Sequence, residues 1–135
     1  MKDEIVSKDN LSKELLREVF EDAYMEVTYD SDGDLMIKDQ YTHYVEVDKD
    51  SRFVAYRCNL RGNENATEMD RFKYVGMINR EVIAIRVAET QSGYSFDCYL
   101  WVEGGVTKRN IVLTFKRFAS LVEYALSKAP EGLFT

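Results

Sequence analysis

Apolar residues recur at helical spacing in three segments of the chain, with polar residues on the opposite positions. Apolar positions three and four residues apart share one face of a helix, so this pattern predicts helices over residues 11–24, 67–79 and 107–128. Residues that can cap a helix stand at or near each start: Asn10, Thr67 and Thr107. In the second helix the predicted apolar face holds Met69, Phe72, Val75 (or Gly76) and Ile78.

Apolar and polar residues alternate in most of the remaining chain, which is the pattern of strands with one buried face. The alternation predicts strands over residues 25–30, 34–39, 42–48, 52–60, 82–90 and 94–103. The resulting order, αββββαββα, joins most strands by hairpins rather than crossovers. It therefore predicts an α+β fold in which an antiparallel sheet is flanked by three helices, with residues 1–135 forming one domain.

The segment YDSDGDL, residues 29–35, places aspartates at alternate positions around a glycine. An EF-hand calcium loop needs glycine at its sixth position and a bidentate glutamate at its twelfth. Counted from Asp30, these positions hold Leu35 and Tyr41, so the closing ligand is missing. Asp32 and Gly33 instead suit a type I′ turn, which needs a positive φ at both central residues. We therefore expect a hairpin turn here and no metal site.

Charge is unevenly distributed along the chain. The 135 residues carry a net charge of −6, with −9 in residues 1–70 and +3 in residues 71–135. An acidic protein repels phosphates, so we expect no nucleic-acid partner. The positive second half keeps a weaker opposite possibility open, although compensation of the acidic first half explains it better. No segment is long and apolar enough for a membrane span or a signal peptide, so we expect a cytoplasmic protein without membrane contact.

Side chains suited to catalysis or metal binding are sparse. His43 is the only histidine, and Cys58 and Cys98 form no CxxC pair, whereas zinc needs four ligands at short paired spacings. Gly104-Gly105 precedes the third helix and could bind an anion, but no Walker lysine accompanies it, so a chain reversal is the better interpretation. We expect no catalytic residues, no cofactor and no metal, and hence no enzyme.

The last predicted strand carries large aromatic residues on both faces. Tyr94, Phe96, Cys98, Leu100 and Val102 alternate on one face, which we assign to the core. Tyr99 and Trp101 then point the other way, and Tyr44 and Phe53 join them if Val45 and Val54 face inward. Trp and Tyr are enriched at binding hot spots, so these four residues are candidates for partner binding. Two alternatives stay open, namely that a helix of the same chain covers this face, or that the aromatics are ordinary half-exposed sheet residues.

The DGDL hairpin is followed by the segments YVEVD and RFVAYRC, and the last predicted strand leads into the third helix through WVEGGVTKRNIVLTF. Together with the order of the elements, these segments resemble the YbjN family, which is described as bacterial sensory transduction regulators. The resemblance covers about residues 10–128. It implies a fold similar to that of class I type III secretion chaperones. The family has no catalytic residues that could be carried over to this chain. Those chaperones dimerise through a helical region equivalent to residues 67–79, which makes Met69 and Phe72 further candidates for partner binding.

Three functions follow from these observations. The first is a non-enzymatic protein-binding module, chaperone-like or regulatory, that forms a homodimer with either Trp101 or the helix over residues 67–79 at the contact. The second is an acidic immunity or inhibitor-type protein that masks a basic toxin or enzyme surface, which the charge of −9 in residues 1–70 suggests. The third is a small-ligand sensor, which would require a deep polar pocket lined by several titratable groups.

Overall fold

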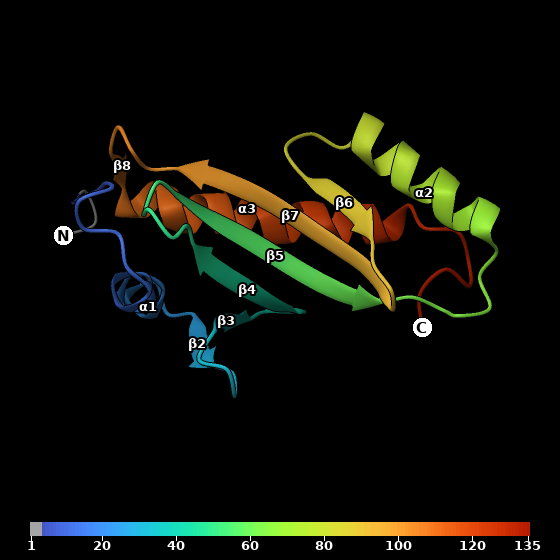
Figure 1. Ribbon diagram of the computed structural model, residues 1–135, viewed down its shortest axis with the longest axis horizontal. Coiled ribbons are helices and arrows are strands. Elements are labelled where there is room, and N and C mark those ends of the chain that lie inside the picture. Colours follow the sequence, from blue (N-terminus) through green and yellow to red (C-terminus); the bar gives the residue numbers. More distant parts are fainter. Residues whose placement is uncertain (1–3) are drawn as a thin grey trace.

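The chain folds into an antiparallel sheet with helices behind it and at one edge (Figure 1). The structure is a computed structural model and describes residues 4–135. The helices are α1 (Lys13–Asp22), α2 (Glu68–Glu81) and α3 (Lys108–Ser127). The main sheet has the order β2-β3-β4-β5-β7-β6, with β2 (Glu26–Tyr29), β3 (Leu35–Lys38), β4 (Thr42–Val47), β5 (Phe53–Arg61), β6 (Arg86–Glu89) and β7 (Gly93–Trp101). Two short strands, β1 (Ile5–Val6) and β8 (Val106–Thr107), pair with each other.

The hydrophobic core lies between one face of the sheet and the helices α1 and α3. Helix α3 passes behind β5 and β7 in Figure 1. Its buried side meets the inward residues of β5, and the Tyr56 hydroxyl donates a hydrogen bond of 2.8 Å to the Ile111 carbonyl. Alternation along residues 52–60 predicts Val54, Tyr56 and Cys58 as the inward set, and this prediction is confirmed, because all three side chains are fully buried. The buried residues of α3 are Ile111, Phe115, Phe118, Ala119, Val122 and Ala125.

Helix α2 packs beside the edge strand β6 and the last turns of α3 (Figure 1). The Tyr74 hydroxyl donates to the Ala125 carbonyl at 2.6 Å, which ties α2 to α3. The Asn79 side chain pairs with the backbone of Val87, because its amide nitrogen donates to the Val87 carbonyl and its oxygen accepts from the Val87 N–H. The outer N–H and carbonyl groups of an edge strand have no neighbouring strand to pair with. Asn79 takes the place of that strand at Val87 and so covers part of this sheet edge.

The face of the sheet that points away from α3 is free of helices, since no helix passes in front of β5 or β7 in Figure 1. Tyr99 and Trp101 are 41% and 56% exposed there, so the alternative that a helix of the same chain covers these aromatics is wrong. We call this surface the open face. Its residues, by strand register, are Tyr44, Glu46, Phe53, Ala55, Arg57, Arg86, Asp97, Tyr99 and Trp101.

The α+β class, the antiparallel sheet and the three helices are confirmed, but the hairpin at Gly33 differs from the prediction. Gly33 has a φ of 82°, whereas Asp32 is not among the residues with positive φ, so the turn is not type I′. The Gly33 N–H donates to the Asp30 carbonyl, and the Asp30 N–H donates to the Asp34 carbonyl. This is the pattern of a three-residue hairpin loop with a left-handed glycine. The sequence prediction gave Asp32 a positive φ because an Asp-Gly pair occurs both in two-residue type I′ turns and in three-residue hairpin loops.

Two element boundaries and one strand pairing also differ from the sequence predictions. Helix α1 is capped by Ser12, whose hydroxyl accepts from the Leu15 N–H, and not by Asn10. Strand β6 begins at Arg86 and not at residue 82, because Val82 caps α2 and Ala84 takes a φ of 70° in the turn that follows. The pairing of β1 with β8 was not predicted at all, since two-residue strands carry no alternation in the sequence.

Candidate functional site

Three aromatic side chains form a cluster on the open face. Phe53 of β5 lies opposite Trp101 of β7 in the ladder, and their ring centroids are 4.9 Å apart. Tyr99 contacts Phe53 edge-on at 5.4 Å. The Arg52 guanidinium lies 6.0 Å from the centroid of the Trp101 ring, within the range of a cation–π contact. We call Phe53, Tyr99 and Trp101 the aromatic cluster. The structure thus brings together three of the four open-face candidates.

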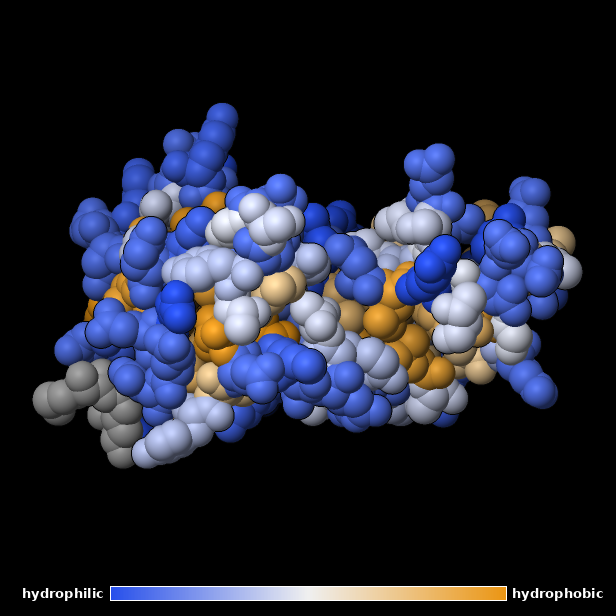
Figure 2. Space-filling view, turned by 90° about the horizontal axis from the view of Figure 1, so that it is seen from below, coloured by the Kyte–Doolittle hydropathy of each residue, from blue (hydrophilic) through white to orange (hydrophobic). Residues whose placement is uncertain are grey.

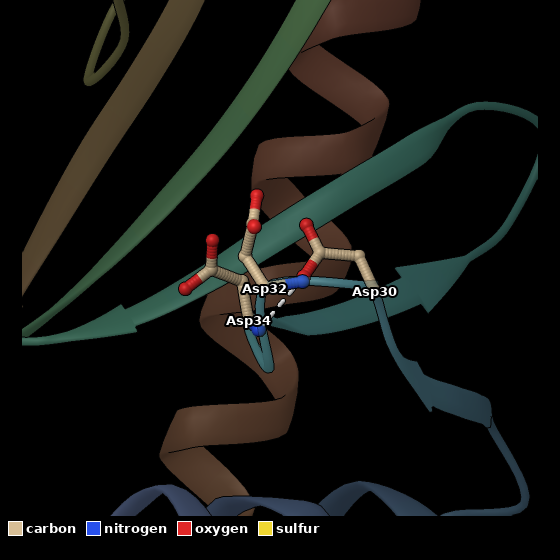
Figure 3. Close-up of side chains that lie close together, drawn as sticks. All are labelled: Asp30, Asp32 and Asp34. Atoms are coloured by element: carbon tan, nitrogen blue, oxygen red, sulfur yellow. Dashed lines mark hydrogen bonds between the residues drawn. The ribbon is translucent and has the colours of Figure 1, made fainter.

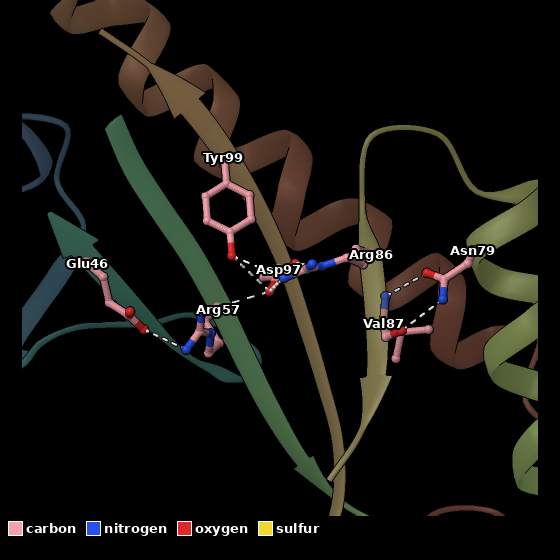
Figure 4. A network of polar contacts seen from close by, with 7 residues as sticks. All are labelled: Glu46, Arg57, Asn79, Arg86, Val87, Asp97 and Tyr99. Carbon is pink, nitrogen blue, oxygen red and sulfur yellow. Dashed lines mark hydrogen bonds and ion pairs between the residues drawn. The ribbon is translucent and has the colours of Figure 1, made fainter. Parts of the chain in front are cut away.

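A polar network adjoins the aromatic cluster (Figure 4). Arg86 binds Asp97 with two contacts, Nε to Oδ1 at 3.0 Å and Nη2 to Oδ2 at 2.9 Å. The same Nη2 donates to the Tyr99 hydroxyl at 3.2 Å, which links the network to the cluster. Arg57 lies 3.9 Å from Asp97 and 3.3 Å from Glu46. Since two guanidinium groups meet two carboxylates, the network has no net charge.

The register of the sheet explains why these polar residues meet. Arg57 pairs with Asp97 across β5 and β7, and Asp97 pairs with Arg86 across β7 and β6. Tyr44, the fourth open-face candidate, is the ladder partner of Arg57 on β4 and is half-buried. The Asp97 side chain is only 8% exposed, while that of Arg86 is 64% exposed. The hydrogen bonds to Asp97 raise the pKa of Arg86, so the guanidinium stays charged.

Sequence reasoning did not identify Arg86, Arg57 or Glu46 as site residues. Asp97 alternates with Tyr99 and Trp101, so its place on the open face was visible in the sequence. Its partners Arg57 and Arg86 come from β5 and β6, and Glu46 of β4 joins the network through Arg57, so only the inter-strand register brings these residues together. Asp97 is the one charged residue that β7 places on this face, beside Ser95, Tyr99 and Trp101, and it is the one signal in the sequence that points toward such a network.

Met69 and Phe72, the candidates on α2, lie apart from the aromatic cluster. Both are exposed, at 59% and 76%, because the side of α2 that faces the protein carries Tyr74 and Ile78 instead. The predicted apolar face of this helix was therefore wrong at Met69 and Phe72. The start of α2 lies near the start of β7, whereas Trp101 ends that strand (Figure 1). The molecule accordingly has two separate candidate surfaces.

Apolar side chains reach the surface in separate areas. From the side on which β2 and β3 lie, Figure 2 shows apolar areas divided by hydrophilic residues. The large apolar residues that are exposed among residues 4–135 are Ile5, Tyr24, Met69, Phe72, Ile83, Tyr99, Trp101, Leu113 and Tyr124. Apolar residues scattered singly are normal on a protein surface, so the places where several gather are the ones that mark candidate binding surfaces.

The three aspartates of the Gly33 hairpin lie close together (Figure 3). One carboxylate oxygen of each falls within 4.8 Å of the others, and such oxygens are the ligands that a divalent cation prefers. Asp30, however, uses its Oδ1 to accept from the N–H groups of Asp32 and Asp34, both at 2.9 Å. These hydrogen bonds give Asp30 a structural role in the turn. The expectation of no metal remains a prediction.

A polar hollow lies at the opposite end of the sheet from Trp101. It has a volume of about 740 Å³, and Arg61, Asn63, Arg71, Glu89 and Tyr94 are among its lining residues. Arg71 pairs with Glu89 at 3.1 Å. The Tyr94 residue is 1% exposed, and its hydroxyl has no hydrogen-bond partner among the described residues. Burial raises the pKa of Tyr94, so the hydroxyl stays protonated at neutral pH.

Comparison with known proteins identifies the fold. A crystal structure of YbjN from E. coli, described as "a putative transcription regulator", matches with a TM-score of 0.73 and 10% sequence identity. The match covers 85% of this chain and 88% of that chain. This chain therefore has a YbjN-like fold, as the sequence motifs predicted. No family model and no curated protein matches the sequence.

Among residues 4–135, no helix combines the length and the apolar character needed to cross a membrane.

Proposed function

We propose that this protein is a non-enzymatic protein-binding module with a regulatory or chaperone-like role, and that it binds its partner on the open face. The observation that carries this proposal is the exposed aromatic cluster of Phe53, Tyr99 and Trp101 beside Arg86. Trp, Tyr and Arg are the residue types most enriched at binding hot spots. The YbjN-like fold supports a regulatory or binding role, since the YbjN structure is described as that of "a putative transcription regulator".

The chemistry of the open face defines what a partner would offer. The aromatic cluster favours an apolar side chain, and the exposed guanidinium groups of Arg86 and Arg52 favour a carboxylate or a backbone carbonyl. The polar network is neutral in sum, so steering by charge contributes little on this face. The expected absence of membrane and nucleic-acid partners and the expected cytoplasmic location are part of this proposal.

The open face can be tested by comparing variants of the purified chain. Wild type, Trp101→Ala and Tyr24→Asn are used to capture proteins from an extract of the native host, and candidate partners are then produced and titrated. Tyr24 is the control, since it is 98% exposed away from the cluster and has a φ of 63°, which Asn tolerates. We expect to find a partner that binds Trp101→Ala roughly tenfold more weakly than wild type, a loss of about 1.4 kcal/mol in binding free energy. The same partner should bind Tyr24→Asn as tightly as wild type. A partner that binds all three chains equally would refute the open face as its site.

The proposed homodimer forms through the outer side of α2. The exposed side of this helix carries Met69, Phe72, Gly76 and Arg80, and Ile83 follows its end. If two copies cross antiparallel at Gly76, each Phe72 meets Arg80 of the second copy, and each Met69 points toward its Ile83. Gly76 supports this arrangement, because a Cβ at this position would contact nothing in the single chain, whereas glycine lets two helices approach closely.

Sedimentation equilibrium at micromolar concentration tests the dimer. We expect about twice the chain mass of 15.7 kDa for the wild type and for Trp101→Ala. Met69→Asp and Gly76→Leu should shift the protein toward the monomer, the first by placing a carboxylate against the apolar Ile83 of the second copy and the second by blocking the close approach. A monomeric wild type would remove the dimer from the proposal, and a dimer lost only in Trp101→Ala would place the contact on the open face.

The polar hollow supports a second candidate function, that of a small-ligand sensor. Its volume of about 740 Å³ lies within the range of ligand pockets, and the Arg71–Glu89 pair and the Tyr94 hydroxyl offer both donors and acceptors. A thermal-shift screen of amino acids, nucleosides and sugars tests this candidate. A compound that stabilises the wild type but not Arg71→Gln supports it. The immunity or inhibitor role has no support beyond the acidic first half of the chain.

A further inference from the structure

Helix α3 carries a positive charge that contrasts with the rest of the protein. Residues 108–128 hold five basic residues and one acidic residue, a net charge of +4 in a chain whose total is −6. All other residues together therefore carry −10. The contrast is local, so it marks a surface that attracts negative charge in an otherwise acidic molecule.

The positive residues lie along the outer side of α3, opposite the core. Arg109, Leu113, Lys116, Ser120 and Tyr124 are exposed and recur at spacings of three and four residues, which places them in one row. We call this row and the adjoining Arg117 the basic stripe. Leu113 and Tyr124 are 51% and 50% exposed, so the stripe alternates cations with apolar side chains.

The charges of the stripe are only partly neutralised by neighbours. Lys108, at the start of α3, pairs with Glu4 at 2.7 Å and also interacts with Glu18 and Asp22 of α1. Lys128, at the end, lies 5.2 Å from the centroid of the Tyr124 ring. Lys116 and Arg117, in the middle, form no ion pair with any other residue in 4–135. The available positive charge is therefore concentrated there.

An apolar pocket opens at one end of the basic stripe. It has a volume of about 340 Å³ and lies between α1 and α3. Its walls are Val19 of α1, the C-cap residue Ala23, and Val112 and Leu113 of α3, while Asp22, Lys108 and Arg109 surround it. Leu113 belongs to both features, so the pocket and the stripe form one continuous surface.

We propose that this surface binds an acidic amphipathic segment of a partner protein, with an apolar side chain in the α1–α3 pocket and carboxylates on Lys116 and Arg117. Two independent observations support it. The pocket is lined by apolar side chains and is complementary to an apolar group, and the basic stripe is positively charged and is complementary to carboxylates. A nucleic acid would satisfy only the stripe, and its phosphates would be repelled by the −10 carried by the remaining residues. This surface lies on the opposite side of the sheet from the aromatic cluster and does not depend on the function proposed for that cluster.

A peptide titration followed by NMR tests the proposal on the full chain. The probe is a synthetic peptide of roughly 15 residues, about four turns of helix, with Leu at helical spacing and Glu or Asp elsewhere. A second peptide replaces the acids by Gln and Asn, and a third replaces Leu by Ser. We expect the first peptide to shift the amide signals of residues 19–23 and 108–117, and the other two to bind roughly tenfold more weakly.

Charge reversal locates the contact. The double variant Lys116→Glu/Arg117→Glu should weaken binding of the first peptide roughly tenfold or more. The matched control, Lys38→Glu/Lys49→Glu, makes the same change of charge at exposed residues outside α3 and should weaken it far less. Leu113→Ser should weaken binding without any change of charge. Circular dichroism confirms that each variant is folded.

Four results would overturn the proposal. These are the absence of signal shifts up to millimolar peptide, shifts centred on other residues, equal weakening in the two charge-reversal variants, and equal binding of the first and third peptides. A short DNA duplex is titrated in parallel. Tighter binding of the duplex than of the first peptide, lost in Lys116→Glu/Arg117→Glu, would assign the stripe to nucleic acid instead.

Discussion

Arg86 and Asp97 face each other as ladder partners on β6 and β7, and the guanidinium contacts both carboxylate oxygens, at 3.0 and 2.9 Å. The relationship is asymmetric, because the Asp97 side chain is 8% exposed and the Arg86 side chain is 64% exposed. The exposed guanidinium therefore covers a nearly buried carboxylate. Without Arg86, the carboxylate would retain only the more distant Arg57 and the Tyr99 hydroxyl.

We predict that this pair stabilises the fold more than an ordinary surface pair. A double-mutant cycle with Arg86→Lys and Asp97→Asn should give a coupling energy of about 1–2 kcal/mol, because lysine cannot make the two-pronged contact. The control cycle uses Arg17 and Glu21, an exposed pair at 3.4 Å, and should give a few tenths of a kcal/mol. Urea unfolding measures both. Equal coupling in the two cycles would show that burial of Asp97 adds nothing.

We predict that Asn79→Ala destabilises the protein by about 1–2 kcal/mol, although alanine is the better helix former. The loss arises because the Val87 N–H and carbonyl both lose their partner. Hydrogen exchange of the Val87 amide should become faster. The control is Asn110→Ala, at an exposed position in the first turn of α3, which should change stability little. If exchange at Val87 is unaffected, the Asn79 contact does not hold the sheet edge.

We predict opposite effects of the same substitution at two glycines. Gly33→Ala should destabilise the protein by about 1 kcal/mol, since a φ of 82° is costly for a residue with a Cβ, and Gly33→Val should cost more. In protein diluted below the concentration at which the proposed dimer forms, Gly76→Ala should stabilise the chain by about 1 kcal/mol, because Gly76 lies inside α2 and its Cβ would meet no atom of the same chain. Thermal unfolding of the variants gives the sign directly. A loss of stability of the diluted Gly76→Ala chain would show that the single chain itself needs the glycine.

We predict that stability falls as the pH is lowered from 7 to about 5 because of His43. His43 is 1% exposed and packs edge-on against Phe115 and Phe118, and this burial lowers its pKa, although Asp39 acts in the opposite direction. The unfolded chain therefore binds a proton below pH about 6.5 that the folded chain does not, which favours unfolding by up to about 1.4 kcal/mol per pH unit.

Urea unfolding across this pH range checks the assignment to His43. The His43→Gln variant has no titrating group at this position, so its stability should vary less between pH 7 and 5. Carboxylates titrate mainly below this window. An identical pH dependence in wild type and variant would mean that other groups are responsible.

The pattern of apolar positions by itself determined the class of the fold, the order of its main elements and the inward residues of β5. These features follow from periodicity, since a helix or strand that buries one face must repeat apolar residues at its own spacing. The same reasoning placed Tyr44, Phe53, Tyr99 and Trp101 on one face of the sheet, where the structure finds them. Sequence motifs also predicted the YbjN-like fold.

Only the tertiary structure decided which residues meet across strands and which helix faces stay exposed. The contacts of Asp97 with its two arginines depend on the register of β5, β6 and β7. A shift of either neighbouring strand by one residue would turn its arginine to the other face of the sheet. Helix α2 is apolar on two sides, so periodicity could not tell whether Phe72 or Tyr74 faces the protein. The position of α2 beside β6 decided this, because Tyr74 reaches the Ala125 carbonyl and Phe72 is left in solvent. Contacts between distant segments depend on how the elements pack, and local sequence does not encode that packing.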